Sequence, residues 1–584
     1  MILQALYEYY QRKAADPESN IAPRGYEWKE IPFLIVIDEN GCFINLEDTR
    51  IGEGKNKRAK RFLVIKSKGR SGSKGWQVTN ILWDHYGYVL SHPKEETDKA
   101  IKDAQNQHGV FKELIKEVVK KHPENAQFKA VENFFSKNDE KGKAFAHPSW
   151  ADCSKIAGCN LSFRVVGEIN IVAEHKDLQE YAFSENTDNS EDSVAGDQSG
   201  VCLITGIKDL IAVTHSATSV PGGKSGGKLV GLQRNSGYDS YNKEQGLNAP
   251  VSRVAEDAYT TALNVLLGKD SQNKFRVADT TTLFWSEKKT DFENHIPWFF
   301  DPPRDNPDEG SQKVKTAFES LYSGKFEDEN DTDFYILGLA PNAARISVRF
   351  WKKDTVKNIA EKIKQHFDDL AIVHSEKDSE YLSLNSLLRS IVLEYKMDNV
   401  PPNMAGAVVE SILDGRPYPV TFLNQCVRRI RAEQHVTHKR AAILKSYINR
   451  YNRSYKPNEK EIAMSLDKEN KNPAYRLGRL FAVLEKIQED AQPGINATIR
   501  DRYYSAASSS PATVFPVLLK LKNHHLAKME NQGWKVNHEK QIGEIMEGLD
   551  PKIPSHLPLP EQGYFAVGYY HQRQEFFKKK DNNN

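Results

Sequence analysis

The feature that most constrains this fold is a change of periodicity at Asp354. Before it, short apolar runs such as residues 31–37, 62–65 and 280–285 are bounded by turn residues and predict strands. After it, apolar residues recur at helical spacing to the end of the chain. The sequence therefore predicts an α+β fold, in which an irregular, multi-lobed N-terminal region with small β-sheets precedes an all-helical C-terminal region ending in a helical bundle.

The clearest helix of the C-terminal region begins after Asn472, which suits the N-cap, while Pro473 suits the first helical position. Its apolar stripe is Leu477, Leu480, Phe481, Leu484 and Ile487. Further helices are predicted at 94–145, 314–322, 355–369, 383–395, 404–413, 420–432, 438–451, 497–508, 512–530 and 562–578. Further strands are predicted at 161–172, 334–339 and 346–351, and a mobile acidic loop at 184–200.

A chain of 584 residues exceeds the usual size of one domain. Four parts are predicted: an α+β region at 1–200, a central α+β module with a Gly-rich loop at 201–353, a basic helical region at 354–463 and a helical bundle at 464–584.

Neither a membrane nor an oxidising compartment is indicated. No run of about 18 apolar residues exists, and the start MILQALYEYYQRK lacks the order of a signal peptide. The five cysteines are scattered without a CxxC pair, so neither a disulfide framework nor a zinc site is indicated. A cytoplasmic location is expected.

The net charge of +2 conceals a basic run at residues 55–74, which holds nine Lys or Arg and no acid. Because no acid interrupts the run, a polyanion is favoured over solvent alone as its partner. Gln77 and Asn80 follow, and their amides offer the donors and acceptors that read base edges. The candidate DNA-motif residues are Lys66, Lys68, Arg70, Ser71, Lys74, Gln77 and Asn80.

A second candidate lies in the glycine-rich loop at 221–227. Glycines let the backbone approach another molecule closely, and neighbouring lysines favour an anionic one. A phosphate-binding loop would need a glycine at position 218, where Thr218 stands, so a nucleotidase is not indicated. The alternative is a merely flexible surface loop. The residues of this nucleic-acid loop are Gly222, Gly223, Lys224, Ser225 and Lys228.

A basic set in the helical region is the third candidate, as a face for a single strand. Its members are Arg428, Arg429, Arg431, Lys439, Arg440, Lys445, Arg450 and Arg453. Tyr447, Tyr451 and Tyr455 recur every four residues, so they lie near one helix face, and cations beside aromatics suit single-stranded nucleic acid. A core-facing tyrosine stripe with solvated arginines is the alternative, and the sequence leaves both open.

No catalytic constellation is apparent. The chain has no HExxH motif, no nucleophile elbow and no dense carboxylate cluster, and histidine pairs such as His435 and His438 lack further ligands at metal-binding spacing. We therefore expect no metal, no cofactor and no enzymatic activity.

Four blocks of the sequence resemble one known family, the large subunit of the type I-C CRISPR surveillance complex, Cascade. They are MILQALYEYY at the start, KEQGLNAPVS with AYTTALN in the central module, FYILGLAPNAARISVRFW at 334–351 and EQGYFAVGYYHQRQEFF at 561–577. Together they span essentially the whole chain.

The resemblance implies a non-catalytic subunit that recognises the protospacer-adjacent motif, helps open the duplex, holds the displaced strand and supports recruitment of a helicase–nuclease. Asn80 occupies the place of an Asn that family members carry before a Leu-Trp-Asp stretch, although the Gly/Ser loop before it is longer here. The implied partners are the guide RNA, target double-stranded DNA and its displaced strand, the repeated backbone subunit, the 5′-handle-binding subunit, a small subunit and the helicase–nuclease, and no membrane. The alternative function is a metal-dependent nuclease acting on the same DNA.

Met464 is the predicted internal start. By resemblance, type I-C systems make their small subunit by initiating translation inside the large-subunit message. A polar segment precedes Met464, and a capped amphipathic helix follows it. The product would have 121 residues, which suits an independent helical bundle resembling the small subunit. The alternative is that Met464 is an ordinary methionine at the end of a loop.

Overall fold

The structure is a computed structural model, and we describe those parts of the chain whose placement it defines. They are residues 1–52, 57–67, 70, 74–183, 198–223, 227–233, 237, 239, 241, 243–300, 319–320, 323, 331–342, 345–549 and 552–578. Most of the loop predicted at 184–200 and most of the helix predicted at 314–322 lie outside these residues.

Packing divides the chain into two units, which we describe separately. Unit 1 comprises Met1–Ser219 with Ser225–Val265, and unit 2 comprises Val220–Lys224 with Leu266–Asn584. The predicted α+β class is confirmed, because sheets occur in both units and helices alone follow β12. The four-part division expected from the sequence stays a prediction. In the described residues, no helix is long and apolar enough to cross a lipid bilayer.

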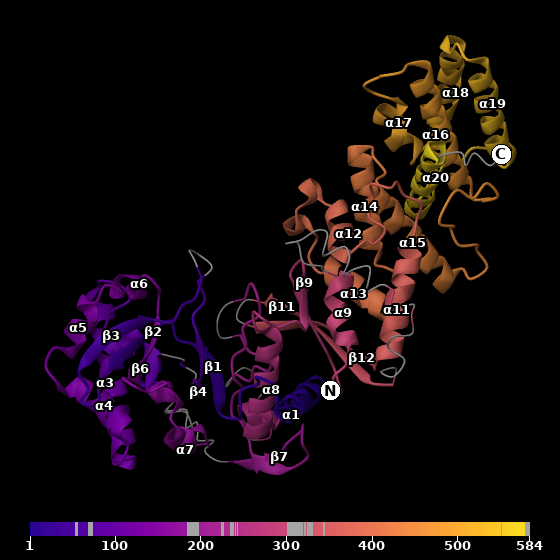
Figure 1. Cartoon of the computed structure of the whole chain (residues 1–584). Helices are drawn as coiled ribbons and strands as arrows, with labels where there is room; N and C mark the ends of the chain where they lie inside the picture. Colours follow the sequence, from indigo (N-terminus) through magenta and orange to yellow (C-terminus); the bar gives the residue numbers. More distant parts are fainter. Residues whose placement is uncertain are drawn as a thin grey trace. The chain divides into compact units, whose positions relative to one another are not determined.

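Unit 1 is built on a four-stranded sheet in the order β3-β2-β6-β5 (Figure 1). Its central strand β2 (Phe33–Ile37) is buried along its whole length and runs parallel to β6 (Asn160–Val165). The amphipathic helix α3 (Asp98–Lys121) begins at Thr97, whose side chain accepts the backbone N–H of Ala100. Phe111 of α3 and Phe128 of the next helix lie in the same apolar core as β2.

The remaining elements of unit 1 follow in chain order. They are α1 (Ile2–Ala14), β1 (Tyr26–Glu30), β3 (Phe43–Asp48), β4 (Arg61–Ile65), the 3-10 turn η2 (Gly75–Gln77), β5 (Trp83–His85), α2 (Tyr86–Leu90), α4 (Ala126–Ser136), α5 (Glu140–Ala146), α6 (Trp150–Ser154), η3 (Val172–Glu174), η4 (Lys176–Leu178), α7 (Gln179–Phe183), β7 (Ser199–Val201), β8 (Lys208–Leu210), η5 (Gln245–Asn248) and α8 (Arg253–Leu267), whose last two residues count with unit 2.

One strand of unit 1 is shorter than expected. The strand or hairpin predicted at 161–172 ends at Val165, because Gly167 turns the chain with a φ of 90° and a 3-10 turn follows at Val172. The predicted helical stretch at 94–145 is confirmed as α3, α4 and α5.

Unit 2 begins with an antiparallel sheet in the order β12-β11-β10-β9. Phe284, Phe334 and Phe350 project from one face of this sheet into a core that they share with α9, α11 and α13. Gly338 of β11 makes room for one of these rings, since a Cβ there would lie 2.4 Å from Cε1 of Phe350.

The elements of unit 2 follow in chain order. They are β9 (Lys274–Val277), β10 (Thr280–Ser286), α9 (Phe292–Phe300), β11 (Asp333–Asn342), β12 (Arg345–Thr355), α11 (Val356–Leu370), α12 (Leu384–Ser390), η7 (Leu393–Tyr395), η8 (Met397–Asn399), α13 (Met404–Asp414), α14 (Val420–Glu433), α15 (His438–Tyr455), α16 (Pro473–Ala491), α17 (Ile499–Ala507), α18 (Pro511–Lys528), α19 (Gln532–Glu547) and α20 (Leu559–Phe577). The helix predicted at 383–395 is therefore broken, and Glu394 and Tyr395 after the break have positive φ.

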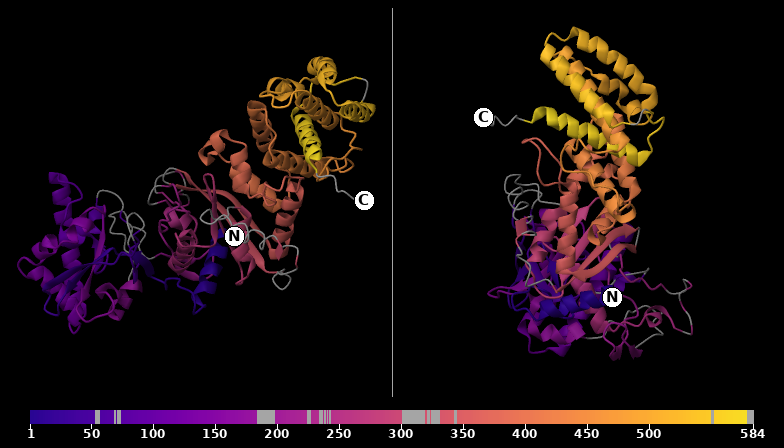
Figure 2. Two further views of the ribbon diagram at one scale, coloured as in Figure 1. Left: turned by 45° about the horizontal axis from the view of Figure 1, so that its top comes forward. Right: turned by 90° about the vertical axis from the view of Figure 1, so that its right-hand side faces the viewer.

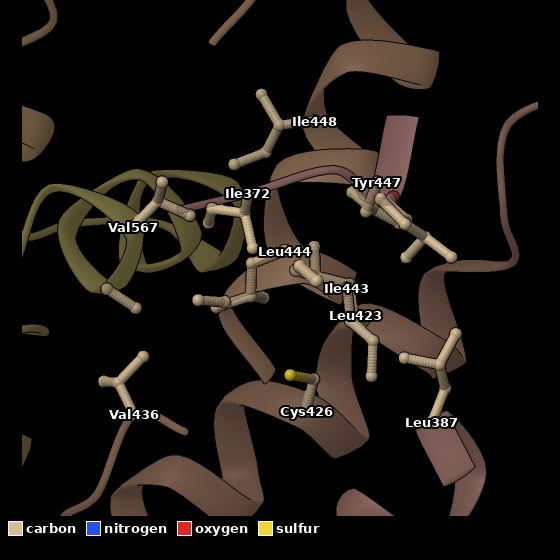
Figure 3. Close-up of a cluster of buried hydrophobic side chains, with 14 of the residues drawn as sticks. Ile372, Leu387, Leu423, Cys426, Val436, Ile443, Leu444, Tyr447, Ile448 and Val567 are labelled. Carbon is tan, nitrogen blue, oxygen red and sulfur yellow. The ribbon is translucent and has the colours of Figure 1, made fainter. Parts of the chain in front are cut away.

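The last helix, α20, packs against α16 and also against α14 and α15 (Figure 2). Its approach to α16 requires glycine, because a Cβ on Gly478 would lie 2.0 Å from the carbonyl oxygen of Phe565. Likewise, a Cβ on Gly568 would lie 2.1 Å from the carbonyl oxygen of Tyr475. On the α15 side, Val567 lies in one apolar cluster with Leu444 and Ile448 (Figure 3). The C-terminal bundle therefore shares its core with the preceding helices.

A charge network is buried between α11 and α15. Asp369, whose side chain is 3% exposed, lies 3.3 Å from Nη1 of Arg450 and 2.7 Å from Nη2 of Arg453. Arg450 also donates to the backbone carbonyls of Ser411 and Arg416, so its guanidinium is satisfied internally. Removing one partner from such a network leaves the other charge buried and uncompensated.

We therefore expect Asp369→Ala to lower the free energy of unfolding by about 3–5 kcal/mol, as for other broken buried ion pairs. Urea denaturation followed by tryptophan fluorescence measures the loss. The control is Glu394→Ala, because Glu394 and Lys396 form an exposed pair whose loss is worth at most about 1 kcal/mol. Equal losses for the two variants would contradict a structural role of the network.

Candidate nucleic-acid interface

The basic run that follows β4 is partly neutralised. Lys66 donates from Nζ to Asp257 at 2.7 Å and to the hydroxyl of Thr260 at 3.3 Å, and both partners lie on α8. Arg70 is ion-paired with Asp84. Lys74 is exposed, whereas Lys68 and Ser71 lie outside the described residues. The run is therefore less cationic toward solvent than its sequence indicates.

The sequence analysis missed Asp84 as a partner of this loop. Its carboxylate is 2% exposed, and its Oδ2 accepts the backbone N–H of Asn80 at 3.0 Å and the hydroxyl of Thr79 at 3.3 Å. A signal in the sequence could have identified it: Asp84 stands four residues after Asn80 and directly after the apolar Trp83, a position where an acid is expected to need internal partners. The Asp84 carboxylate also accepts from Arg70 and from the backbone N–H of His85.

The guanidinium of Arg70 is held on three sides. Besides Asp84, it donates from Nε to the carbonyl of Val78 at 2.8 Å and lies 4.2 Å above the ring of Tyr88. Burial raises the pKa of Tyr88 to about 12, so its hydroxyl keeps its proton and donates to the carbonyl of Trp76 at 3.0 Å. Contacts through Arg70 and Tyr88 therefore connect the backbone carbonyls of Val78 and Trp76.

The two candidate amides differ in exposure. Gln77 is half-buried, whereas Asn80 is 7% exposed, and its side-chain oxygen has no hydrogen-bond partner in the described parts of the chain. A buried amide oxygen without a partner is costly. This oxygen is consequently available to accept a hydrogen bond from an incoming donor. Because Asn80 is buried, part of the covering loop must shift before a base edge can reach the oxygen.

The glycine-rich loop is only partly described. Lys224 and Ser225 lie outside the described residues, Gly222 and Gly223 are exposed, and Lys228 is half-buried. Gly222 has a φ of 84°, a backbone conformation that residues with a side chain rarely adopt. This local backbone requirement alone accounts for the glycine. A substitution at Gly222 is therefore strained whether or not the loop meets nucleic acid.

The basic set in the helical region falls into three groups. Arg440, Lys445 and Arg450 are buried and bond to internal carbonyls, and therefore lie on no surface of this chain. The partly exposed members Arg429 and Arg453 are paired with acids. Arg428 and Arg431 on α14 are exposed, Lys439 is half-exposed, and the described residues provide none of these three with an ion-pair partner.

The tyrosine stripe of α15 runs from the core to the surface. Tyr447 is 5% exposed and belongs to the apolar core, Tyr451 is half-buried, and Tyr455 is 66% exposed. The rings of Tyr447 and Tyr451 are stacked with centroids 6.2 Å apart, and the ring of Tyr455 is tilted by 50° against that of Tyr451 at 4.9 Å. Of the two alternatives, core packing describes Tyr447, and only Tyr455 offers a ring to a base.

Two histidines next to the basic set have lowered pKa values. Burial lowers the pKa of His438 to about 4 and also lowers the pKa of His435. In the described ranges, no group of three His, Cys, Asp or Glu side chains is placed to hold a metal ion together.

Comparison with known proteins places most of the chain in one family model. A family model described as CRISPR-associated protein (Cas_Csd1) matches residues 6–577, which covers nearly all of both units. No curated protein matches the chain.

The exposed cations of α14 provide a test of the predicted strand-binding face. We expect Arg428→Ala combined with Arg431→Ala to weaken binding to single-stranded DNA. The slope of log affinity against log salt should flatten by about 1.4, because two phosphate contacts are lost. Fluorescence anisotropy across a salt series measures both quantities. Arg416→Ala is the control, since Arg416 is exposed but already paired with Glu410 and Asp414. An unchanged slope in the double variant would remove α14 from the strand path.

Proposed function

Since the chain belongs to the CRISPR-associated Cas_Csd1 family, that of the type I-C large subunits, we propose that it is the DNA-testing subunit of an RNA-guided surveillance complex. In such a complex, pairing with the guide RNA reads the target sequence, and the protein reads a short flanking motif in the duplex. The subunit then binds, opens and holds DNA without cutting it.

The observation that carries this proposal is the arrangement around Asn80. An amide with an unpartnered oxygen lies in unit 1 beside Arg70, and the exposed Lys74 precedes it in the same loop. Cations draw the phosphate backbone close regardless of sequence, whereas an amide distinguishes bases through its donor and acceptor. The two chemistries that motif recognition needs therefore occur in one short segment.

The displaced strand is the proposed ligand of the helical region. Arg428, Arg431 and Lys439 supply charge, and Tyr455 supplies an exposed ring, on the helices α14 and α15. Charge with occasional stacking suits a single strand of any sequence. The proposed partners are the guide RNA, the repeated backbone subunit, the 5′-handle-binding subunit and a recruited helicase–nuclease in the cytoplasm.

Asn80→Ala tests motif reading. The ratio of affinities for duplexes with the correct and an incorrect flanking motif should fall by about tenfold, as for the loss of one good base contact. Electrophoretic mobility shifts with the assembled complex measure the ratio.

The matched variant replaces Lys66, Lys68 and Lys74 by Ala. It should weaken binding to all duplexes alike and leave the ratio unchanged, and thermal melting reports any cost of losing the contact between Lys66 and Asp257. An equal loss of both affinities in Asn80→Ala would show that Asn80 is no reader.

A metal-dependent nuclease remains the competing function. It requires the purified chain alone to cleave DNA when Mg²⁺ or Mn²⁺ is added, whereas the binding function requires no cleavage by the chain. Cleavage that disappears with a chelator and persists through further purification would replace the present proposal.

We also propose that Met464 starts a separate small subunit. Met464 is 58% exposed and lies in a polar segment between α15 and α16, where its carbonyl accepts the backbone N–H of Val373 at 2.8 Å. The helices α16 to α20 all follow it. A product beginning there lacks α14 and α15, so the face of α20 around Gly563 and Val567 would be uncovered unless another surface meets it.

Intact mass spectrometry of complex made from the native gene tests this start. A species of 121 residues, or one residue shorter without the initiator, should accompany the full chain. Met464→Leu should abolish the short species and leave the full chain folded, because this side chain is exposed. A control substitution at another exposed methionine, Met546→Leu, should leave both species in place. Absence of the short species from DNA-binding complex would contradict the internal start.

A further inference from the structure

A buried acid lies beneath the proposed motif-reading segment. Asp84 belongs to β5, which pairs with β6 at the edge of the unit 1 sheet. Its Oδ2 accepts from the backbone of Asn80 and the hydroxyl of Thr79, and its Oδ1 accepts the backbone N–H of His85 at 2.8 Å. Arg70 supplies the opposite charge. A carboxylate with 2% exposure needs such a full set of partners, because burying an unpaired charge is costly.

The backbone between Asn80 and Asp84 is itself constrained. Leu82 has a φ of 60°, which is uncommon for a residue with a side chain, and it is 1% exposed. Its carbonyl accepts the hydroxyl of Ser162 on β6 at 2.8 Å. Such a conformation persists only where the surroundings determine it. Asp84 and Ser162 hold this turn at two points, so the backbone that carries the buried Asn80 side chain has a fixed geometry.

The same carboxylate fixes the cation beside the amide. Arg70 reaches Asp84, the carbonyl of Val78 and the ring of Tyr88 simultaneously. Without Asp84 the guanidinium would lose its only ion-pair partner in the described parts of the chain, and the contact to Val78 would lose its anchor. Arg70, Val78 and Asn80 would then move independently.

We propose that Asp84 is a positioning residue for motif recognition, which acts by holding Asn80 and Arg70 in the geometry that reads the flanking bases. This inference rests on the proposed function. It assigns to Asp84 no contact with DNA. A loosely held amide still forms hydrogen bonds, but it forms them with any base edge, so the loss appears in discrimination rather than in overall affinity.

Asp84→Asn is the direct test, because it keeps the shape and removes the charge. In assembled complex, we expect the ratio of affinities for correct and incorrect flanking motifs to fall by about tenfold, close to the effect of losing one base contact. The double variant Asp84→Asn with Asn80→Ala should match Asn80→Ala alone, because a residue that acts through another adds nothing once that other is removed.

Glu140→Gln is the matched control. Glu140 is also a buried acid of unit 1, which accepts the backbone N–H of Phe43 at 2.6 Å and pairs with Lys143. We expect it to lower the melting temperature as Asp84→Asn does and to leave the discrimination ratio unchanged. If the Asp84→Asn protein does not assemble into the complex, Arg70→Gln is the second variant to be tested. It removes the cation that balances Asp84 and should lower the ratio in the same direction, by less.

The outcomes separate the two hypotheses. If Asn80→Ala lowers the ratio and Asp84→Asn, or Arg70→Gln in its place, does not, the positioning role is overturned and the proposed function stands. The positioning role is also overturned if the effects of Asp84→Asn and Asn80→Ala add. If Asn80→Ala leaves the ratio unchanged, Asn80 is not the reader, and the role of Asp84 falls with that part of the proposed function.

Discussion

Buried carboxylates determine how many of the cations in this chain remain available on its surface. An acid inside a protein needs an internal counter-charge, since its transfer from water is costly and only a close partner offsets that cost. Asp84 engages Arg70, and Asp369 engages Arg450 and Arg453. In the terminal bundle, Glu485 is fully buried and lies 3.8 Å from Arg573. Each of these acids withdraws positive charge from solvent that a count of basic residues would assign to a polyanion.

This constraint explains which parts of the site could be predicted from sequence. The helix capped by Asn472, the buried strand at residues 31–37 and the change of periodicity after Asp354 follow from local patterns. They are present as α16, β2 and the junction between β12 and α11. The pairing of Lys66 with Asp257 joins residues almost two hundred positions apart, and no local pattern encodes it. Exposure of a single arginine likewise depends on which helix covers it, so Arg428 and Arg450 looked alike in sequence.

The two units combine different ways of holding polar groups. In unit 1, the segment near Asn80 is short and irregular and is fixed by side chains that bond to backbone: Asp84 to Asn80, Tyr88 to Trp76, and Ser162 to Leu82. In unit 2, Arg428, Arg431 and Lys439 lie on the long helices α14 and α15, so their orientation follows from helical geometry and from the apolar face beneath them. Recognition of a defined motif benefits from the first arrangement, and contact with a strand of arbitrary sequence tolerates the second.

The position of α20 also has a consequence for synthesis of the chain. This helix is translated after α14, α15 and α16, yet its Val567 completes an apolar cluster with Leu444 and Ile448, and its Gly568 lets it meet α16 closely. The apolar face of α14 and α15 that α20 covers therefore stays uncovered until more than a hundred further residues have been translated. The core of unit 2 is therefore complete only once α20 has been translated, whereas the four-stranded sheet of unit 1 has all its strands by Val165.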